Sequence, residues 1–265
     1  CIRDSGEGER DDAPMLYIGE ELGSMVGAEG APKIDIAVDP LECTNNCADD
    51  QPNSIAVLAA APRGTLLHAP DCYMNKLAAG PALAGHVSLE GGAVYNIEQA
   101  MHVLDCEAKD VRIVALDRER HHQLFKEINE TGAQLELLGD GDVAGAIWAA
   151  KDDGPFDMLM GVGAAPEGVI SATAIRGIGG VFEGRLVFRS AQEEARAETM
   201  VGDDLGRLWQ ATDLCQSEDA VFAASGVCDG YLPGVKIGAD HTTTFNELID
   251  VSAKTVARNE RRRPA

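Results

Sequence analysis

Residues 112–150 read RIVALDRERHHQLFKEINETGAQLELLGDGDVAGAIWAA, and this stretch decides the class of fold. The apolar runs Arg112–Leu116 and Gln134–Leu138 have the length and composition of strands. The segment between them ends in Gly132, a natural helix terminus. It places four side chains on one helical face: His121, Leu124, Phe125 and Ile128. Strands that alternate with helices imply right-handed βαβ crossovers and an α/β fold.

The alternation continues on the C-terminal side of this stretch. Asp142 is suited to cap a helix over Val143–Ala150. Asp157–Met160 reads as the next strand, and Pro166 suits the first position of the helix that follows it. The C-terminal half is therefore predicted to contain a mainly parallel sheet.

The flanking regions read as short strands separated by turn residues, with one helix over about Asn96–Ala108. The predicted strands are Ile34–Val38, Ser54–Ala59, Ala220–Ala224 and Thr242–Ile249. We therefore predict a layered α/β protein with a mainly antiparallel sheet in residues 1–110 and a mainly parallel sheet in 111–265. The two halves are expected to form one continuous unit.

Charge narrows the choice of partners. The 265 residues include 22 Lys and Arg against 44 Asp and Glu, a formal net charge of −22. That balance disfavours nucleic acid or an anionic membrane surface as the main partner. A phosphorylated substrate would also be repelled unless a local cation reversed the field, so the surplus carboxylates indicate bound metal. The alternative is that most of them form a solvated acidic surface.

Cysteine usage and hydropathy indicate the compartment. The seven cysteines are scattered and contain no C-x-x-C pair, so neither a disulfide framework nor a zinc site is indicated. A reducing, intracellular compartment fits best. No run of eighteen apolar residues and no signal-peptide pattern occurs. The chain starts at Cys1 and ends in Arg-Arg-Arg-Pro-Ala, so we expect its natural ends to lie outside it.

Residues 34–45 read IDIAVDPLECTN and carry the strongest chemical signal. An apolar strand ends in Asp39, Pro40 forces a turn, and Glu42 follows three residues after Asp39. Carboxylates at the end of a strand can converge on hard cations, which take oxygen ligands. Thr44 would then lie where backbone N–H groups can meet a phosphate. The alternative is a helix start whose acidic residues only complement the helix dipole.

This segment resembles the Asp-Pro-x-Glu-Gly-Thr motif of class II fructose-1,6-bisphosphatases, which belong to the lithium-sensitive, metal-dependent phosphatases. Three further segments resemble the same family in the same order. They are GEGERDDAPMLYIGEE at 6–21, DGDVA at 140–144 and GAAPEGV at 163–169. The sequences of these motifs are most similar to those of the cyanobacterial-type enzymes, which also cleave sedoheptulose 1,7-bisphosphate.

The resemblance implies a layered αβαβα sugar-phosphatase fold. It implies hydrolysis of the 1-phosphate of fructose 1,6-bisphosphate, and of sedoheptulose 1,7-bisphosphate as a second substrate, with Mg²⁺ or Mn²⁺ as cofactor. A homo-oligomer, dimer or tetramer, is expected. So is a cytoplasmic location, or the plastid stroma in a photosynthetic eukaryote.

By the same resemblance the metal ligands are Glu7, Asp39, Glu42 and Glu167, with Asp39 bridging two ions. Asp39, Glu42 and Thr44 are the expected catalytic residues, and Thr44 positions or activates the attacking water. Glu167 follows Pro166 and so falls in a first helical turn, facing the carboxyl end of a strand. The alternative is that the negative charge of Glu167 only interacts favourably with the helix dipole.

The resemblance also implies a set of substrate contacts, in which Arg118 and Arg120 hold the phosphate that is not hydrolysed. Without the resemblance, the alternative for Arg118 and Arg120 is that they are ordinary surface arginines. Asp140 and Asp142 would then form a turn and a helix cap, and Tyr73 would pack in the core. The full set is Glu42, Cys43, Thr44, Tyr73, Arg118, Glu119, Arg120, Asp140, Gly141, Asp142 and Ala164.

Three departures from the family pattern leave a second function open. Cys43 replaces a Gly, so a side chain crowds the backbone at a position where the family has none. Glu119 replaces a Pro and adds a negative charge between two arginines. An earlier helix and a Thr-Ala-Asp motif, which supplies another metal ligand, would precede this chain. The competing function is therefore a diverged or truncated paralogue without turnover. A nucleotide site at 161–163 is excluded because Pro166 stands where the third Gly is required.

Overall fold

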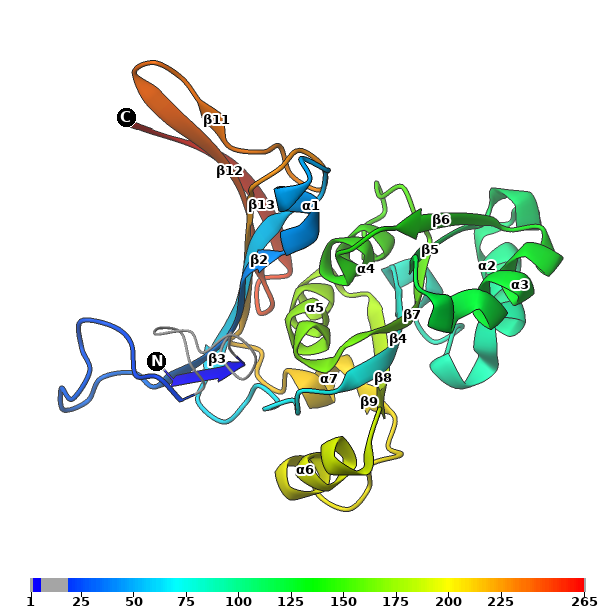
Figure 1. Ribbon diagram of the computed structural model, residues 1–265, viewed down its shortest axis with the longest axis horizontal. Coiled ribbons are helices and arrows are strands. Elements are labelled where there is room, and N and C mark those ends of the chain that lie inside the picture. Colours follow the sequence, from blue (N-terminus) through cyan, green and yellow to red (C-terminus); the bar gives the residue numbers. More distant parts are fainter. Residues whose placement is uncertain (1, 6–18, 265) are drawn as a thin grey trace.

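The computed structural model describes residues 2–5 and 19–264. In this part of the chain a first sheet, the helices α4 and α5, a second sheet, and the helices α2 and α3 follow one another as layers (Figure 1). The helices are α1 (Thr44–Ala48), α2 (Gly92–Leu104), α3 (His122–Thr131), α4 (Asp142–Ala150), α5 (Ala165–Ile178), α6 (Ala191–Val201) and α7 (Ala211–Leu214). The predicted α/β class is confirmed.

The first sheet is mainly antiparallel. Its strand order is β1-β2-β3-β10-β12-β11, and β13 also pairs with β12. Only β1 and β2 are parallel among the described pairs of this sheet. The strands are β1 (Ile2–Ser5), β2 (Ile34–Glu42), β3 (Ile55–Pro62), β10 (Val221–Gly226), β11 (Lys236–Ile237), β12 (His241–Asp250) and β13 (Thr255–Pro264).

The second sheet is mixed, with the order β6-β5-β7-β4-β8-β9. Its parallel part is β6-β5-β7, and the pairs from β7 through β4 and β8 to β9 are antiparallel. The strands are β4 (Tyr73–Ala79), β5 (Arg112–Leu116), β6 (Gln134–Leu138), β7 (Met158–Ala164), β8 (Val181–Val187) and β9 (Trp209–Gln210). Because β4 joins this sheet and β10 to β13 join the first, the sheets exchange strands across residue 110. The division into two sequence halves stays a prediction.

The stretch that predicted the fold forms the elements expected of it. β5 and β6 have the predicted bounds, and Gly132 ends α3 with φ 83°. The helix expected at about Asn96–Ala108 instead spans Gly92–Leu104. Asn96 is buried within it and exchanges hydrogen bonds of 2.9 and 2.8 Å with the backbone of Ser88. The helix therefore begins four residues earlier than predicted, and Asn96 lies inside it in contact with the preceding loop.

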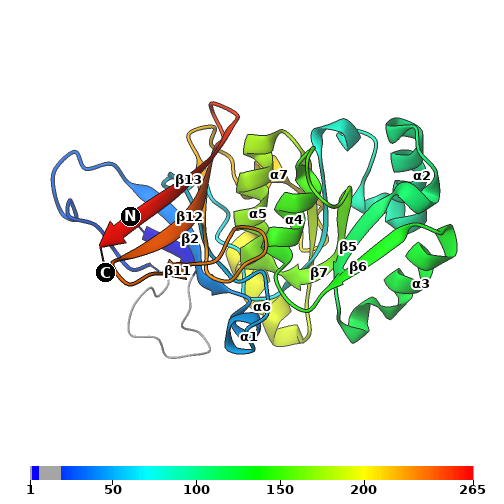
Figure 2. The ribbon, with the colours of Figure 1, turned by 90° about the horizontal axis from the view of Figure 1, so that it is seen from above.

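α4 and α5 lie between the two sheets, as Figure 2 shows from above. Both helices are apolar on nearly all sides, as expected for helices without a solvent face. Glycines on α5 allow close approach to both sheets. A Cβ atom on Gly168 would lie 2.8 Å from the sulfur of Met74 on β4, and one on Gly177 would lie 2.4 Å from Ile249 on β12.

A second core lies between the other face of the mixed sheet and α2 with α3. None of the helices in the described residues is long and apolar enough to cross a membrane. The larger core surrounds α4 and α5 and holds both sheets against that layer. As a result, the end of β2 meets the first turns of α4 and α5.

Candidate active site

β2 ends in an irregularity that separates its last two carboxylates, Asp39 and Glu42. Asp39 faces Val57 of β3 while Glu42 faces Ile55, so β2 has one more residue than β3 in this interval. Such a bulge redirects side chains at the end of a strand. The Leu41 N–H donates to Oδ1 of Asp39 at 3.0 Å and closes a local turn.

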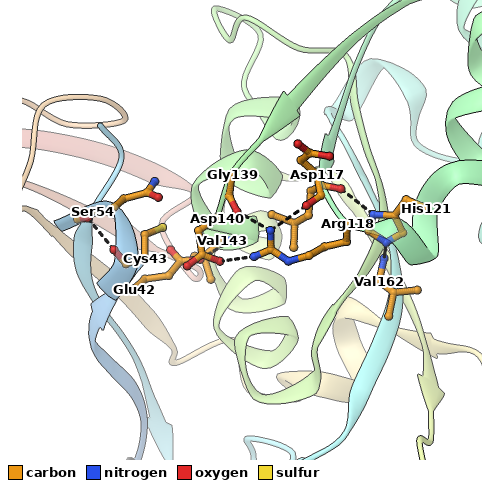
Figure 3. A network of polar contacts seen from close by, with 12 residues as sticks. Glu42, Cys43, Ser54, Asp117, Arg118, His121, Gly139, Asp140, Val143 and Val162 are labelled. Atoms are coloured by element: carbon orange, nitrogen blue, oxygen red, sulfur yellow. Dashed lines mark hydrogen bonds and ion pairs between the residues drawn. The ribbon is translucent and has the colours of Figure 1, made fainter. Parts of the chain in front are cut away.

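Glu42 is buried and reaches across to the start of α4. The Val143 N–H donates to its Oε1 at 2.8 Å (Figure 3). Its Oε2 is sealed from solvent and has no hydrogen-bond partner among the described residues. Burial raises the pKa of Glu42 well above its usual value, and the nearby charge of Asp142 raises it further.

Glu167 lies in the first turn of α5, as the sequence predicted. The residue is partly exposed, but its Oε2 is sealed from solvent and has no hydrogen-bond partner among the described residues. Burial raises the pKa of this carboxyl to about 7, although the positive charge of Lys76 opposes the shift. The charge of Glu167 also raises the pKa of Glu42, so the two carboxylates lie near each other.

Asp142 does not cap α4, which corrects the expectation for this residue. Gly141 occupies the cap position with φ 91°, and Asp142 is the first helical residue. Its Oδ2 accepts a hydrogen bond from Nζ of Lys76 at 2.5 Å. The Lys76 side chain is 1% exposed and that of Asp142 8%, so this is a buried ion pair.

The donor set fits a divalent cation. Buried carboxylate oxygens without partners are costly unless a cation or a proton compensates them, and oxygen ligands suit Mg²⁺ and Mn²⁺. Glu42 and Glu167 supply such oxygens, and the half-buried carboxylate of Asp39 lies near both of them. Among the described residues, however, no group of three or more His, Cys, Asp or Glu side chains is arranged to hold a metal ion. The fourth expected ligand, Glu7, lies outside the described residues.

The raised pKa of Glu167 predicts how the stability of the metal-free protein depends on pH. A raised folded-state pKa gives a stabilising contribution that is complete below the unfolded value of 4.5 and lost as pH rises through about 7. For this carboxyl the loss is on the order of 3 kcal/mol. In urea unfolding with EDTA, the free energy of unfolding of Glu167→Gln should fall less between these pH values than that of the parent protein. The exposed control Glu136→Gln should retain it, and equal slopes for both variants would contradict the assignment.

Cys43 adopts the backbone conformation that favours glycine, with φ 66° and ψ 52°. Its thiol is buried against the loop that carries Asp140 and Gly141, which we call the substrate loop because the family resemblance implies substrate contacts there. A Cβ on Gly141 would lie 2.3 Å from the Cys43 Sγ. Burial raises the pKa of the Cys43 thiol far above its usual value, and the negative charge of Glu42 raises it further. A thiolate that competes for metal is therefore disfavoured. The Cys47 thiol hydrogen-bonds with that of Cys228, so an oxidative pair with Cys43 is not favoured either.

Removing this side chain is expected to help catalysis. Cys43→Gly should raise kcat/KM by roughly tenfold, or about 1.4 kcal/mol, because it relieves both the left-handed backbone and the crowding of the substrate loop. Cys43→Ala keeps the Cβ and removes the sulfur, so it separates the two causes. Steady-state phosphate release under reducing conditions measures both variants. A glycine variant no faster than the parent would show that crowding does not limit turnover.

Arg118 joins two loops at the edge of the site. It donates to the carbonyl oxygens of Asp117 at 2.9 Å and Gly139 at 2.6 Å, and pairs with Oδ1 of Asp140 at 3.0 Å (Figure 3). Its guanidinium therefore fixes the 139–140 loop that precedes α4.

Tyr73 lies between two guanidinium groups. The Arg120 guanidinium is 4.6 Å from the ring centre and that of Arg189 is 4.8 Å from it. Arg120 also donates to the carbonyl of Val162 at 3.2 and 2.6 Å. Arg189 pairs with Glu193 on α6. The structure thus brings together Tyr73 and Arg120, two of the expected substrate contacts, and adds Arg189.

Sequence reasoning placed His121 on a helix face and missed its role in the site. His121 is buried, its Nδ1 lies 2.7 Å from the Leu116 carbonyl, and its Nε2 accepts from the Val162 N–H at 2.8 Å. This pairing defines a neutral ring with the proton on Nδ1, and burial lowers the pKa of His121 accordingly. The ring ties β5 to β7 and so positions the Arg118–Arg120 turn.

The remaining predicted residues surround these groups. Thr44 is exposed at the first position of α1, and Glu119 is exposed at the start of a 3₁₀ turn. Ala164 ends β7 opposite Tyr73 of β4 and precedes the first turn of α5. Lys76 and Arg189 were not predicted. Lys76 had a signal, because it shares a strand face with Met74 and Ala78, both apolar.

The site combines buried carboxylates suited to a hard cation with arginines suited to a phosphate. This combination is typical of metal-dependent phosphatases. Within that class, residues 4–262 match the family described as "Bacterial fructose-1,6-bisphosphatase, glpX-encoded", and the chain belongs to it. The resemblance drawn from the four motifs is confirmed.

Curated relatives support the same assignment. A protein of Prochlorococcus marinus subsp. pastoris is 44% identical over 264 residues, covering 94% of this chain and 78% of the relative. A protein of Synechococcus sp. (strain RCC307) is 45% identical over 258 residues, covering 92% and 76%. Both are named D-fructose 1,6-bisphosphatase class 2/sedoheptulose 1,7-bisphosphatase.

Proposed function

We propose that the chain hydrolyses the 1-phosphate of fructose 1,6-bisphosphate, and acts on sedoheptulose 1,7-bisphosphate as well, releasing phosphate and the sugar monophosphate. One observation carries the proposal. In a chain that matches the bisphosphatase family over residues 4–262, the Oε2 atoms of Glu42 and Glu167 are buried without partners among the described residues. Two such oxygens beside Asp39 call for a divalent cation.

We assign Asp39, Glu42 and Glu167, together with Glu7, as the residues that hold Mg²⁺ or Mn²⁺. The bound metal supplies charge neutralisation for the phosphate and a water of lowered pKa. The exposed hydroxyl of Thr44 positions the attacking water next to Glu42. Glu42 is itself held by the Val143 N–H, so its free oxygen is oriented before any ligand arrives.

The arginine side of the site binds the phosphate that is not hydrolysed. Arg120 and Tyr73 stack on each other, and Arg118 orders the loop that carries Asp140 and Gly141. We assign the sugar hydroxyls to the loop at 140–142 and to Ala164. Ion pairing and backbone contacts fix these groups in advance, which lowers the ordering cost of binding.

A phosphate-release assay tests the proposal. With either bisphosphate, activity should depend fully on added Mg²⁺ or Mn²⁺ and fall to background after EDTA treatment. Activity that survives exhaustive EDTA treatment would overturn the metal assignment. Absence of phosphate release under every condition would favour the non-catalytic paralogue instead.

Two further expectations concern the oligomeric state and the cellular location. We infer a homo-oligomer, dimer or tetramer, which size-exclusion chromatography with light scattering tests. We also infer a cytoplasmic location, in keeping with cysteines that are unpaired in the described residues.

A further inference from the structure

Lys76 is the feature of the site that the proposed function does not use. It lies on β4, within a strand whose other residues on the same face are buried and apolar. Its side chain is 1% exposed. Lysine is almost never buried to this degree without a partner, because an ammonium loses its hydration there. Its position therefore requires a specific electrostatic reason.

The partner of Lys76 is Asp142, across 66 residues of sequence, with Nζ to Oδ2 at 2.5 Å. The pair lies against a bare stretch of backbone on β7. A Cβ atom on Gly163 would be 1.7 Å from Oδ2 of Asp142 and 3.1 Å from Nζ of Lys76. A glycine at this point of the family motif thus makes room for the ion pair.

The pair also borders the two carboxylates assigned to the metal. The Asp142 charge acts on both Glu42 and Glu167, and the Lys76 charge acts on Glu167. The charge of Asp39 also acts on Glu42 and Glu167, so four carboxylates share one neighbourhood, but their partners differ. Asp142 has an ammonium, whereas Oε2 of Glu42 and Oε2 of Glu167 have no hydrogen-bond partner among the described residues.

We propose that Lys76 is a positioning residue that withdraws Asp142 from the cation site and leaves Glu42 and Glu167 to bind the divalent ion. The inference rests on the proposed function. By neutralising one carboxylate, Lys76 limits the negative charge that the cation meets, and it holds Asp142 at the first turn of α4. That turn carries the Val143 N–H that orients Glu42.

The proposal predicts changes of opposite sign in cation binding. In Lys76→Met the unpaired Asp142 joins the site, so the Mn²⁺ affinity of the metal-free protein should rise by about tenfold. In Asp142→Asn the unpaired ammonium opposes the cation, so affinity should fall by about the same factor. The double variant restores neutrality and should bind Mn²⁺ within about threefold of the parent, the non-additivity expected of a contacting pair.

Electron paramagnetic resonance titration of Mn²⁺ into each metal-free variant measures these affinities without turnover. Lys109→Met, which removes an exposed lysine paired with Glu107, serves as the control and should bind like the parent. A purely structural role for Lys76 predicts weaker binding in both single variants, and that result would overturn the inference. If Lys76→Met fails to fold without metal, the weaker binding of Asp142→Asn and its recovery in the double variant decide the question.

The same titration separates this inference from the proposed function. A parent protein that binds no Mn²⁺ and releases no phosphate would defeat the proposed function. A parent that binds Mn²⁺ and turns over, with no opposite shifts in the single variants, would defeat only the assignment of Lys76.

Discussion

Asp39→Asn is expected to lower kcat/KM for fructose 1,6-bisphosphate by at least about 100-fold, since even residues that only support a metal ligand contribute roughly 10- to 100-fold. Asn keeps the shape of the side chain and its ability to accept from the Leu41 N–H. It removes the negative charge at the end of β2. The loss should therefore appear in catalysis and Mn²⁺ affinity, with little change in the urea midpoint.

Asp49→Asn is the matched control, because Asp49 is an exposed carboxylate in the same segment. It should retain activity within about twofold, as expected of a surface substitution. Measured by phosphate release over a range of Mn²⁺ concentrations, the Asp39 variant should require more metal. Comparable activity of the two variants would remove Asp39 from the set of ligands.

Arg120→Ala is expected to lower kcat/KM for the bisphosphate by roughly 10- to 100-fold, the range for losing a charge-assisted hydrogen bond of about 1.5–3 kcal/mol. A sugar monophosphate has no distal phosphate to lose, so its kcat/KM should change by less than about threefold. Binding energy from a remote group that orients the reacting one would explain this difference.

Two other arginines of the mixed-sheet side of the molecule, Arg118 and Arg185, provide the comparison. Arg118→Ala should show the same preference plus a loss of stability, because Arg118 fixes the 139–140 loop. Arg185→Ala removes an exposed arginine on β8 that pairs with Glu90 and should leave both substrates unaffected. Equal losses on bisphosphate and monophosphate for Arg120→Ala would contradict a role in holding the distal phosphate.

Local pattern was sufficient for the elements that depend on nearby residues. The runs at Arg112–Leu116 and Gln134–Leu138 became strands with those bounds, and Gly132 ended the intervening helix. The helix near Asn96 begins and ends four residues earlier than predicted. Asn96 lies inside it and exchanges hydrogen bonds with Ser88, a contact that helix periodicity does not reveal.

By itself the sequence determined the α/β class and the family, since ordered motifs carry both chemistry and position, and it predicted the residues that we assign to the candidate site. Only the tertiary structure decided how those residues are paired. Lys76 meets Asp142 across 66 positions, and the Val143 N–H meets Glu42 across 101. Arg189 reaches the ring of Tyr73 from beyond β8. These contacts depend on how two sheets enclose α4 and α5, and sequence spacing contains no distance between segments that meet only after folding.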